Sequence, residues 1–478
     1  MQVFNKAVNK YKSLSKPAKA SVWFIACYVI QRGLQFLGMP IYTRIMSTDE
    51  YGEYSVFLSW FNILCVFSSL SIYNGTFNKA MVKYENERDK YISSVQWLTL
   101  LFGLIFSIAI LSYNSIITTK TGYSLKFQLL LAIHLLFFPS LQYWSQKQRF
   151  LFEYKKLVLI TLINSALSLG MGIVFVLVSE EKSFALVATT VMAQAAINVI
   201  LFISLSIKGK KFYQREYWGW SLKTSIPLIP HYLSEILLGH ADRLMINQMC
   251  GSSEAGIYNI VYQISMIMTI IRTGINGSFT PWFFLSLKEE KYDDVKKTSR
   301  LIAILMAGLT LAFMLVSPEL LRIVAPPTYY EAVTGIPAIM IGCYFIFIYV
   351  LFLNVEIFYE QNQFVAVASI IAAVVNVLLN YICINRFGYI AAAYTTMASY
   401  MLMAFLHYLF FLRIAKNHRE LRGIYDVRSL FVCSFVLIAI GIWILFLYDY
   451  VLIRYIITLV VSVITYKFRK NNVRTFNT

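Results

Sequence analysis

Fourteen long apolar stretches follow one another almost without interruption along this chain of 478 residues. An apolar run of about twenty residues is long enough to cross a bilayer as an α-helix. Several of the runs, such as 91–119, 332–355 and 361–385, contain no charged residue. A soluble protein of this length could not bury so many apolar segments, so the sequence predicts an all-α polytopic membrane protein.

Lysine and arginine occur in every second gap between these stretches, and this alternation predicts the orientation. Thirty-two of the 42 Lys and Arg residues would lie on one side of the membrane. Positively charged loops stay in the cytoplasm, so both termini are expected there. The net charge of +18 is therefore attributed to orientation and to contact with anionic lipid headgroups, and we expect no nucleic-acid partner. The basic segments are 6–19, 79–90, 147–156, 208–223, 288–300, 413–428 and 467–474.

The apolar pattern predicts fourteen transmembrane helices in two blocks of six and a final pair. The first block is expected at 18–42, 54–73, 91–113, 123–145, 157–178 and 183–207. The second block is expected at 222–249, 255–285, 301–316, 332–355, 364–384 and 389–412, and the pair at 430–447 and 451–466.

An internal repeat relates the two blocks. The pattern Arg-Ile/Leu-Met, a spacer and Glu-x-Gly-x-Tyr occurs at 44–54 and again at 243–258. Because six helices separate equivalent positions, the halves would be related by a pseudo-two-fold axis along the membrane normal, as in many secondary transporters, which bind substrate between their halves. The expected organisation is a basic N-terminal segment (1–17), an N-lobe (18–207), a linker (208–221), a C-lobe (222–412), a basic linker (413–429), a helix pair (430–466) and a cytoplasmic tail (467–478).

Ionisable residues inside the expected spans are the best candidates for a site, because a charge in hydrocarbon is costly and usually faces a cavity or a partner. Arg32, Glu235 and Arg272 lie at similar depth and could line one central cationic chamber that binds substrate. The alternative, a buried Arg–Glu pair that only ties the halves together, stays open. His134 and His231 are candidates for coupling or for ordinary hydrogen bonding within helices.

Two further acidic positions complete the candidates. Glu356 is expected at the turn between the tenth and eleventh spans and is a gating candidate. Asp242 and Arg243 lie near the outer end of the seventh span, where an interfacial salt bridge would explain them.

Signals for an enzyme are weak. The six cysteines are scattered, without metal-ligand or disulfide-framework spacing, and no phosphate-binding glycine loop or nucleophile elbow is present. We therefore expect no catalytic residues, no metal site and no cofactor.

The first ninety residues resemble the start of bacterial oligosaccharide repeat-unit flippases of the Wzx type, which are related to lipid II flippases and to MATE-type exporters. The similarity lies in the segment 21–33, in the segment 40–54 with its Thr-Arg-Ile…Glu-Tyr-Gly-Glu-Tyr pattern, and in Ser59, Trp60 and the segment 77–84. The resemblance implies a V-shaped pair of six-helix lobes with two added C-terminal helices.

The resemblance also implies a function. The substrate would be a polyprenyl-diphosphate-linked oligosaccharide, a precursor of O-antigen, capsule or exopolysaccharide, moved from the inner to the outer leaflet of the bacterial inner membrane by alternating access. Arg32 and Arg272 fit the arginines that line the cationic cavity of related flippases. Partners would be membrane lipids and the polysaccharide polymerase and chain-length machinery, with a monomer as the transport unit.

Two alternatives remain. A cation-coupled multidrug exporter of the same superfamily would need a more acidic cavity than one Glu and two Arg provide. A membrane polysaccharide polymerase or glycosyltransferase would need a sizeable outer loop, whereas the outer loops here are short.

Overall fold

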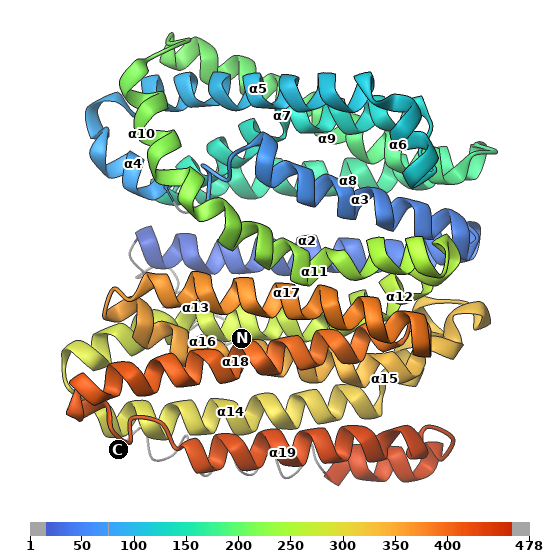
Figure 1. Cartoon of the computed structure of the whole chain (residues 1–478), viewed down its shortest axis with the longest axis vertical. Coiled ribbons are helices and arrows are strands. Elements are labelled where there is room, and N and C mark those ends of the chain that lie inside the picture. Colours follow the sequence, from blue (N-terminus) through green and yellow to red (C-terminus); the bar gives the residue numbers. More distant parts are fainter. Residues whose placement is uncertain (1–15, 75, 461–478) are drawn as a thin grey trace, which may run out of the picture. The chain divides into compact units, whose positions relative to one another are not determined.

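The computed structural model describes residues 16–74 and 76–460, and it is built from helices (Figure 1). Without water, a backbone can satisfy its hydrogen bonds within a single segment only as a helix, which explains why the apolar stretches fold in this way. Most of the expected N-terminal segment, the tail and residues 461–466 of the last span lie outside the described residues.

Eleven of the described helices are long and apolar enough to cross a membrane. The chain is therefore an all-α polytopic membrane protein, as predicted. The other expected spans coincide with α3, α11 and the ten described residues of Val451–Val460, which are helical but fall outside those eleven. The count of fourteen spans stays a prediction.

The helices form two compact units. Of the described residues, the first unit contains 16–46 together with Val56–Leu233, and the second contains Ser47–Ser55 and 234–460. Helices of the first unit are α2 (Lys16–Ile45), most of α3 (Thr48–Ser68), α4 (Phe77–Lys83), α5 (Arg88–Ser112), α6 (Asn114–Thr121), α7 (Leu125–Phe150), α8 (Tyr154–Val178), α9 (Lys182–Gly209) and α10 (Arg215–Ser225).

The second unit contains most of α11 (Ile229–Met249) and the remaining helices. Within it, α16 and α18 run side by side (Figure 1). Gly342 of α16 lets the ring of Tyr400 on α18 approach closely. These helices are α12 (Ser252–Ser265), α13 (Ile267–Lys288), α14 (Tyr292–Leu315), α15 (Ser317–Val324), α16 (Gly335–Phe358), α17 (Asn362–Phe387), α18 (Ala391–Asn417) and α19 (Val427–Trp443). Short 3-10 helices cover Glu85–Glu87, Ile226–Leu228, Pro327–Thr334, Arg419–Leu421 and Ile444–Leu447.

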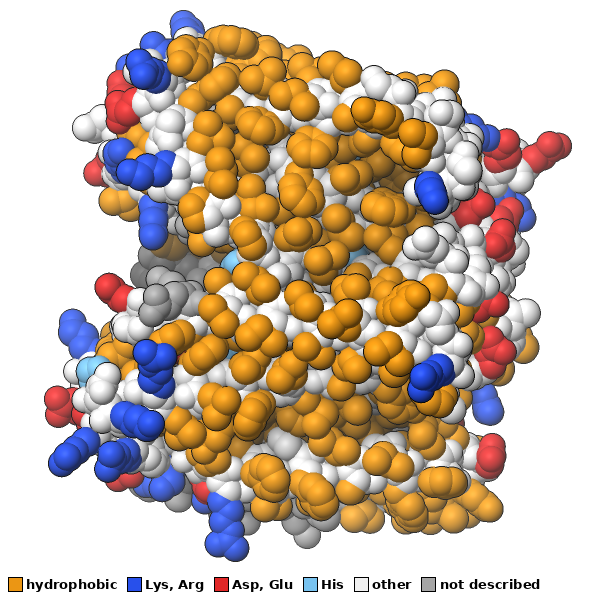
Figure 2. Space-filling model, in the orientation of Figure 1, with side chains coloured by type: hydrophobic (Ala, Val, Ile, Leu, Met, Phe, Trp, Pro, Cys, Tyr) orange, Lys and Arg blue, Asp and Glu red, His pale blue; other side chains and the backbone are white. Residues whose placement is uncertain are grey.

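The surface of each unit matches a membrane environment. Hydrophobic side chains cover the middle of the face shown in Figure 2, whereas Lys and Arg gather at one end of the helices in each unit. Leu159, Val174 and Phe431 are among the large apolar side chains left exposed. This distribution suits helices whose sides face lipid and whose ends face water.

The two copies of the sequence repeat touch each other inside the second unit. A Cβ atom on Gly52 of α3 would lie 1.7 Å from the carbonyl oxygen of Ser252, and one on Gly256 of α12 would lie 2.2 Å from that of Thr48. The hydroxyl oxygens of Thr48 and Ser253 are 2.7 Å apart. Glycine is therefore required in both copies because the two backbones cross without room for a side chain.

An aromatic cluster anchors α10 within the first unit. The rings of Tyr84 and Tyr91 stack with centroids 5.1 Å apart, and the Tyr217 and Trp220 rings of α10 pack edge-on against Tyr84. The Tyr217 hydroxyl donates a hydrogen bond of 2.6 Å to Glu87. These contacts hold the segment that leads into the second unit against α4 and α5.

Candidate functional site

Arg272 and Glu235, two of the predicted site residues, come close to a common side chain in the second unit. Arg272 lies in α13 and is half-buried. It follows by six residues the interruption at Met266 that separates helices α12 and α13. Its Nε atom has no hydrogen-bond partner among the described residues. Glu235 is exposed on α11. The Tyr349 hydroxyl of α16 interacts electrostatically with both Glu235 and Arg272.

Arg32, the other predicted substrate ligand, belongs to the first unit. It is exposed on α2, where its Nη1 donates a hydrogen bond of 3.1 Å to Gln35 and its guanidinium lies 5.4 Å from the Tyr28 ring centroid. Among the described residues these contacts are with neighbours on its own helix, and an exposed guanidinium of this kind is accessible to an anion. The joint placement of Arg32 and Arg272 in one chamber stays a prediction.

The two candidate histidines occupy different settings. His134 of α7 is buried, with its Nε2 atom 3.0 Å from the Gln194 amide oxygen and its ring stacked 3.7 Å from that of Phe61. His231 of α11 is half-buried, with its ring 5.3 Å from that of Tyr232. The surroundings of His134 are those of a packed, hydrogen-bonded helix residue.

Glu356 does not lie in a turn, as its place in the sequence suggested. It lies inside α16, which continues to Phe358, and its side chain is fully buried. Its Oε1 atom is 2.8 Å from Nδ1 of His407 on α18, which is also fully buried. The prediction missed His407, although an ionisable residue in the middle of an apolar run is the same signal that singled out His134.

The prediction of an interfacial salt bridge between Asp242 and Arg243 is also wrong, because both side chains are buried and have other partners. Asp242 accepts hydrogen bonds from Tyr258 (2.5 Å), Asn380 (2.7 Å) and Thr396 (2.7 Å). Buried carboxylates need such donors because their desolvation is costly. The cluster is a closed network that could admit a hard cation only if those donors turned away.

Arg243 points into a different set of partners. Its Nε donates to the Asn259 amide oxygen at 2.9 Å, its Nη1 donates to the Gly239 carbonyl at 2.6 Å, and its guanidinium lies 4.2 Å from the Tyr262 ring centroid. The sequence analysis did not single out Asn376 and Asn380, whose spacing of four residues within an apolar run could have indicated the Asp242 network.

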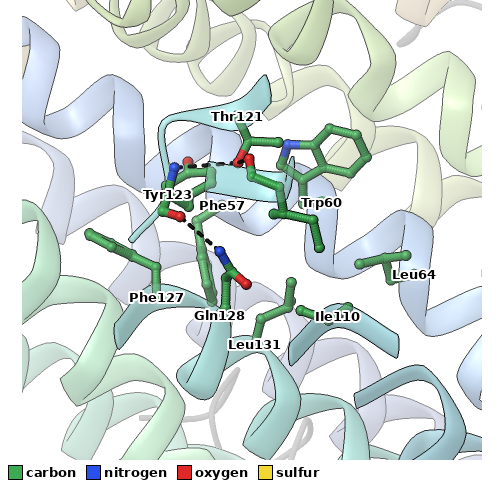
Figure 3. Close-up of a pocket in the computed structure, with 10 residues that line it drawn as sticks. Phe57, Trp60, Leu64, Ile110, Thr121, Tyr123, Phe127, Gln128 and Leu131 are labelled. Carbon is green, nitrogen blue, oxygen red and sulfur yellow. Dashed lines mark hydrogen bonds between the residues drawn. The ribbon is translucent and has the colours of Figure 1, made fainter. Parts of the chain in front are cut away.

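The first unit contains a mainly apolar pocket between α3, α5, α6 and α7, of about 180 Å³ (Figure 3). The Gln128 side chain is buried in its wall, and its Nε2 donates to Thr118 and to the Tyr123 carbonyl at 3.0 Å each. Its Oε1 atom has no partner among the described residues. The pocket suits an apolar ligand. It is lined by Phe57, Trp60, Leu64, Ile110, Ile117, Thr121, Tyr123, Phe127, Gln128 and Leu131.

In the part of the chain that the structure describes, no group of three or more His, Cys, Asp or Glu side chains is placed to hold a metal ion. Ionisable side chains that lie close together include Glu235 and Arg272 around Tyr349, and the Glu356–His407 pair.

Comparison with solved structures identifies the fold. The lipid II flippase MurJ in an inward closed conformation superposes with a TM-score of 0.65 at 15% identity, covering 95% of this chain and 99% of that one. A multidrug resistance MATE family transporter of the MOP superfamily, inward-facing, gives a TM-score of 0.63 at 14% identity, covering 81% and 96%. At these identities the similarity concerns the fold.

Sequence comparison identifies the family. The Lsg locus putative protein 1 of Haemophilus influenzae is 21% identical over 382 residues, or 76% of this chain and 90% of that protein. The MatE family model matches residues 227–382, and the polysaccharide biosynthesis protein model matches residues 18–287, more than half of the chain. The resemblance found in the first ninety residues is thus confirmed, and the chain belongs to the polysaccharide biosynthesis protein family.

Proposed function

We propose that the protein is a flippase that moves a polyprenyl-diphosphate-linked oligosaccharide from the inner to the outer leaflet of the bacterial plasma membrane by alternating access. The observation that carries the proposal is Arg272, a half-buried guanidinium in a spanning segment whose Nε has no partner among the described residues. Such a charge is costly in a membrane unless it serves a ligand. In a polysaccharide biosynthesis protein, the fitting ligand is a lipid-linked sugar with an anionic diphosphate.

The chemistry of arginine supports this substrate. The planar guanidinium presents paired N–H donors that match a phosphate group bidentately. A diphosphate and its sugars cannot cross hydrocarbon unaided, so the carrier must supply charge-assisted hydrogen bonds. We propose that Arg32 contacts the same anionic substrate and that Glu235, which shares the neighbourhood of Tyr349 with Arg272, is a coupling residue of the transport cycle.

Surface polysaccharide in a deletion strain tests the proposal. Arg272→Ala and Arg32→Ala should each impair export at unchanged membrane protein level, and Lys at either position should rescue only part of it. Arg322→Ala is the matched control, because Arg322 is exposed in the short helix α15. Full export by both alanine variants would refute the substrate role. Restored export in Arg272→Ala combined with Glu235→Gln would instead favour a structural pair.

The same strain separates the alternatives. Loss of a flippase leaves lipid-linked repeat units trapped inside, whereas loss of a polymerase lets single units reach the surface. The MatE match over residues 227–382 favours a cation-coupled multidrug exporter as the second candidate. In that case deletion would raise drug susceptibility and leave the surface polysaccharide intact.

The proposed orientation places both termini in the cytoplasm. Reporters fused after the basic segments should all be cytoplasmic, because positive loops resist translocation. A periplasmic reporter at any of these positions would overturn the orientation. The fusion sites are Lys83, Lys210, Lys291 and Lys416.

A further inference from the structure

Glu356 and His407 form a buried pair that ordinary packing does not explain. Both side chains are fully buried, and Oε1 of Glu356 lies 2.8 Å from Nδ1 of His407. Oε2 of Glu356 and Nε2 of His407 have no hydrogen-bond partner among the described residues. Each unpaired buried polar group costs about 1–3 kcal/mol, so apolar side chains would hold α16 and α18 together more stably.

The pair is connected to the proposed substrate arginine by one aromatic side chain. The Tyr349 ring stacks on the His407 imidazole with centroids 5.3 Å apart and an interplanar angle of 18°. The Tyr349 hydroxyl lies within electrostatic reach of Arg272 on α13 and Glu235 on α11. Tyr349 therefore packs on His407, which pairs with Glu356, and lies within electrostatic reach of Arg272.

Asp242 and Arg243 of α11 are buried with their own partners on α12, α17 and α18. The other charged residues on the packed helices, apart from Glu235 and Arg272, lie at helix ends. Arg386 is the only charge on α17 and falls in its last turn, and Arg428 falls in the first turn of α19. The charges of α14 fall within 293–300, at its start, and those of α18 are Arg413 and Lys416 near its end. The first turn of α12 holds Glu254, and the last turn of α13 holds Lys288.

Three further titratable residues lie on segments next to α16. Tyr425 donates its hydroxyl to the Leu351 carbonyl at 2.5 Å, and the Tyr408 ring packs against Phe352. Glu331 of the Pro327–Thr334 turn accepts from Tyr389. His407 is thus the ionisable group in hydrogen-bond contact with Glu356 among the described residues.

The pair can hold and exchange a proton without a separate partner. A neutral imidazole that accepts from a protonated carboxyl and an imidazolium that donates to a carboxylate contain the same protons and are both neutral overall, the state that burial favours. Uptake of one more proton makes the pair cationic, and release of one makes it anionic. Imidazole is the side chain that exchanges protons near neutral pH.

We propose that Glu356 and His407 are the proton-binding site of this carrier and that their charge is coupled through Tyr349 to an anion bound at Arg272. An anion there neutralises positive charge beside Tyr349, so anion binding and proton uptake favour each other, and the linkage is reciprocal. The coupling rests on the proposed function, whereas proton binding by the pair does not.

Histidine-selective NMR on the full chain, labelled with ¹⁵N in the imidazole rings, tests proton binding. The chain has five histidines, and His407→Gln assigns the signal of interest. His407 should titrate, and Glu356→Gln should move its midpoint by at least about one pH unit, a tenfold change in proton affinity. Glu356→Asp, which keeps the carboxyl group, should retain a titrating pair if the Gln variant fails to fold.

The chain contains a matched control. His418 and Glu420 form an exposed pair, with Nδ1 and Oε1 3.1 Å apart. Glu420→Gln should change the His418 signal and leave that of His407 unaltered. An invariant His407 signal in the wild type, or the same midpoint in Glu356→Gln, would overturn the proton site.

Inorganic diphosphate serves as the probe for coupling. Diphosphate should raise the pH midpoint of the His407 titration in the wild type and should leave this midpoint unchanged in Arg272→Ala. A midpoint indifferent to diphosphate in the wild type, or an equal shift in Arg272→Ala, would refute the coupling. These titrations require no transport, so a failure of export in the deletion strain bears on the proposed function alone.

Discussion

Replacing Gly52 by alanine should disturb the crossing of the two repeat copies. A Cβ at Gly52 would lie 1.7 Å from the Ser252 carbonyl oxygen and 3.1 Å from the Gly256 nitrogen. Contacts under about 3 Å are not tolerated, so the backbones of α3 and α12 must separate by more than an ångström. Because backbone cannot rotate aside as a side chain does, we expect at least the upper part of the ~1–3 kcal/mol cost of overpacking.

A matched control isolates the crossing from helix propensity. Gly170 of α8 is also helical, and a Cβ there would meet no atom within 4 Å. Gly170→Ala should be neutral or stabilising by about 0.5–1 kcal/mol, the usual gain of alanine over glycine inside a helix. The two substitutions are chemically identical, so their difference measures the clash.

Thermal denaturation of the purified protein, followed by loss of monodisperse material, is the assay. A penalty of about 2–3 kcal/mol should lower the melting temperature of Gly52→Ala by roughly 4–12 °C, given about 2–4 °C per kcal/mol for a large domain. Gly256→Ala should behave similarly. Equal melting temperatures for Gly52→Ala and Gly170→Ala would refute the reasoning.

Three further predictions concern buried or capping side chains. Hydrogen bonds from Ser429 hold the pKa of Asp426 below its ordinary value. The stabilisation of the fold that these bonds provide is therefore complete above about pH 4 and is lost as the pH falls through the folded pKa. Asp426→Ala should cost about 1 kcal/mol of stability and remove this acid dependence of the melting temperature. Arg454 is fully buried and bound by Glu319 through two contacts of 2.7 Å, so Glu319→Ala should cost about 3 kcal/mol, and adding Arg454→Met should recover most of it in chemical denaturation. Asp242→Asn places an amide among three donors and should cost about 1–3 kcal/mol, whereas an unchanged melting temperature would show that the network rearranges freely.

The apolar pattern predicted the class of fold because a membrane helix satisfies its backbone hydrogen bonds within one segment of the chain. Runs such as 332–355 were placed within three residues of the observed helix Gly335–Phe358. That small error at the end still mattered, since it put Glu356 in a turn. Helix ends depend on caps and neighbouring contacts, which hydropathy does not contain.

The sequence pattern identified the two copies of the repeat but did not predict that they cross each other. The pattern at 44–54 and 243–258 marked equivalent helices but could not reveal that Gly52 and Gly256 face each other across a helix crossing. A glycine in a sequence is equally compatible with a turn, a kink or a close approach, and only the partner backbone distinguishes them.

The sequence by itself determined the membrane class, the helical segments and the family resemblance, because each depends on residues near one another in the chain. Only the tertiary structure decided which polar groups meet: Asp242 with Asn380 and Thr396, and Glu356 with His407. Those partners are 51 to 154 residues apart. A buried polar side chain must find its partner through the packing of whole helices, and that packing is a property of the fold and not of any one segment.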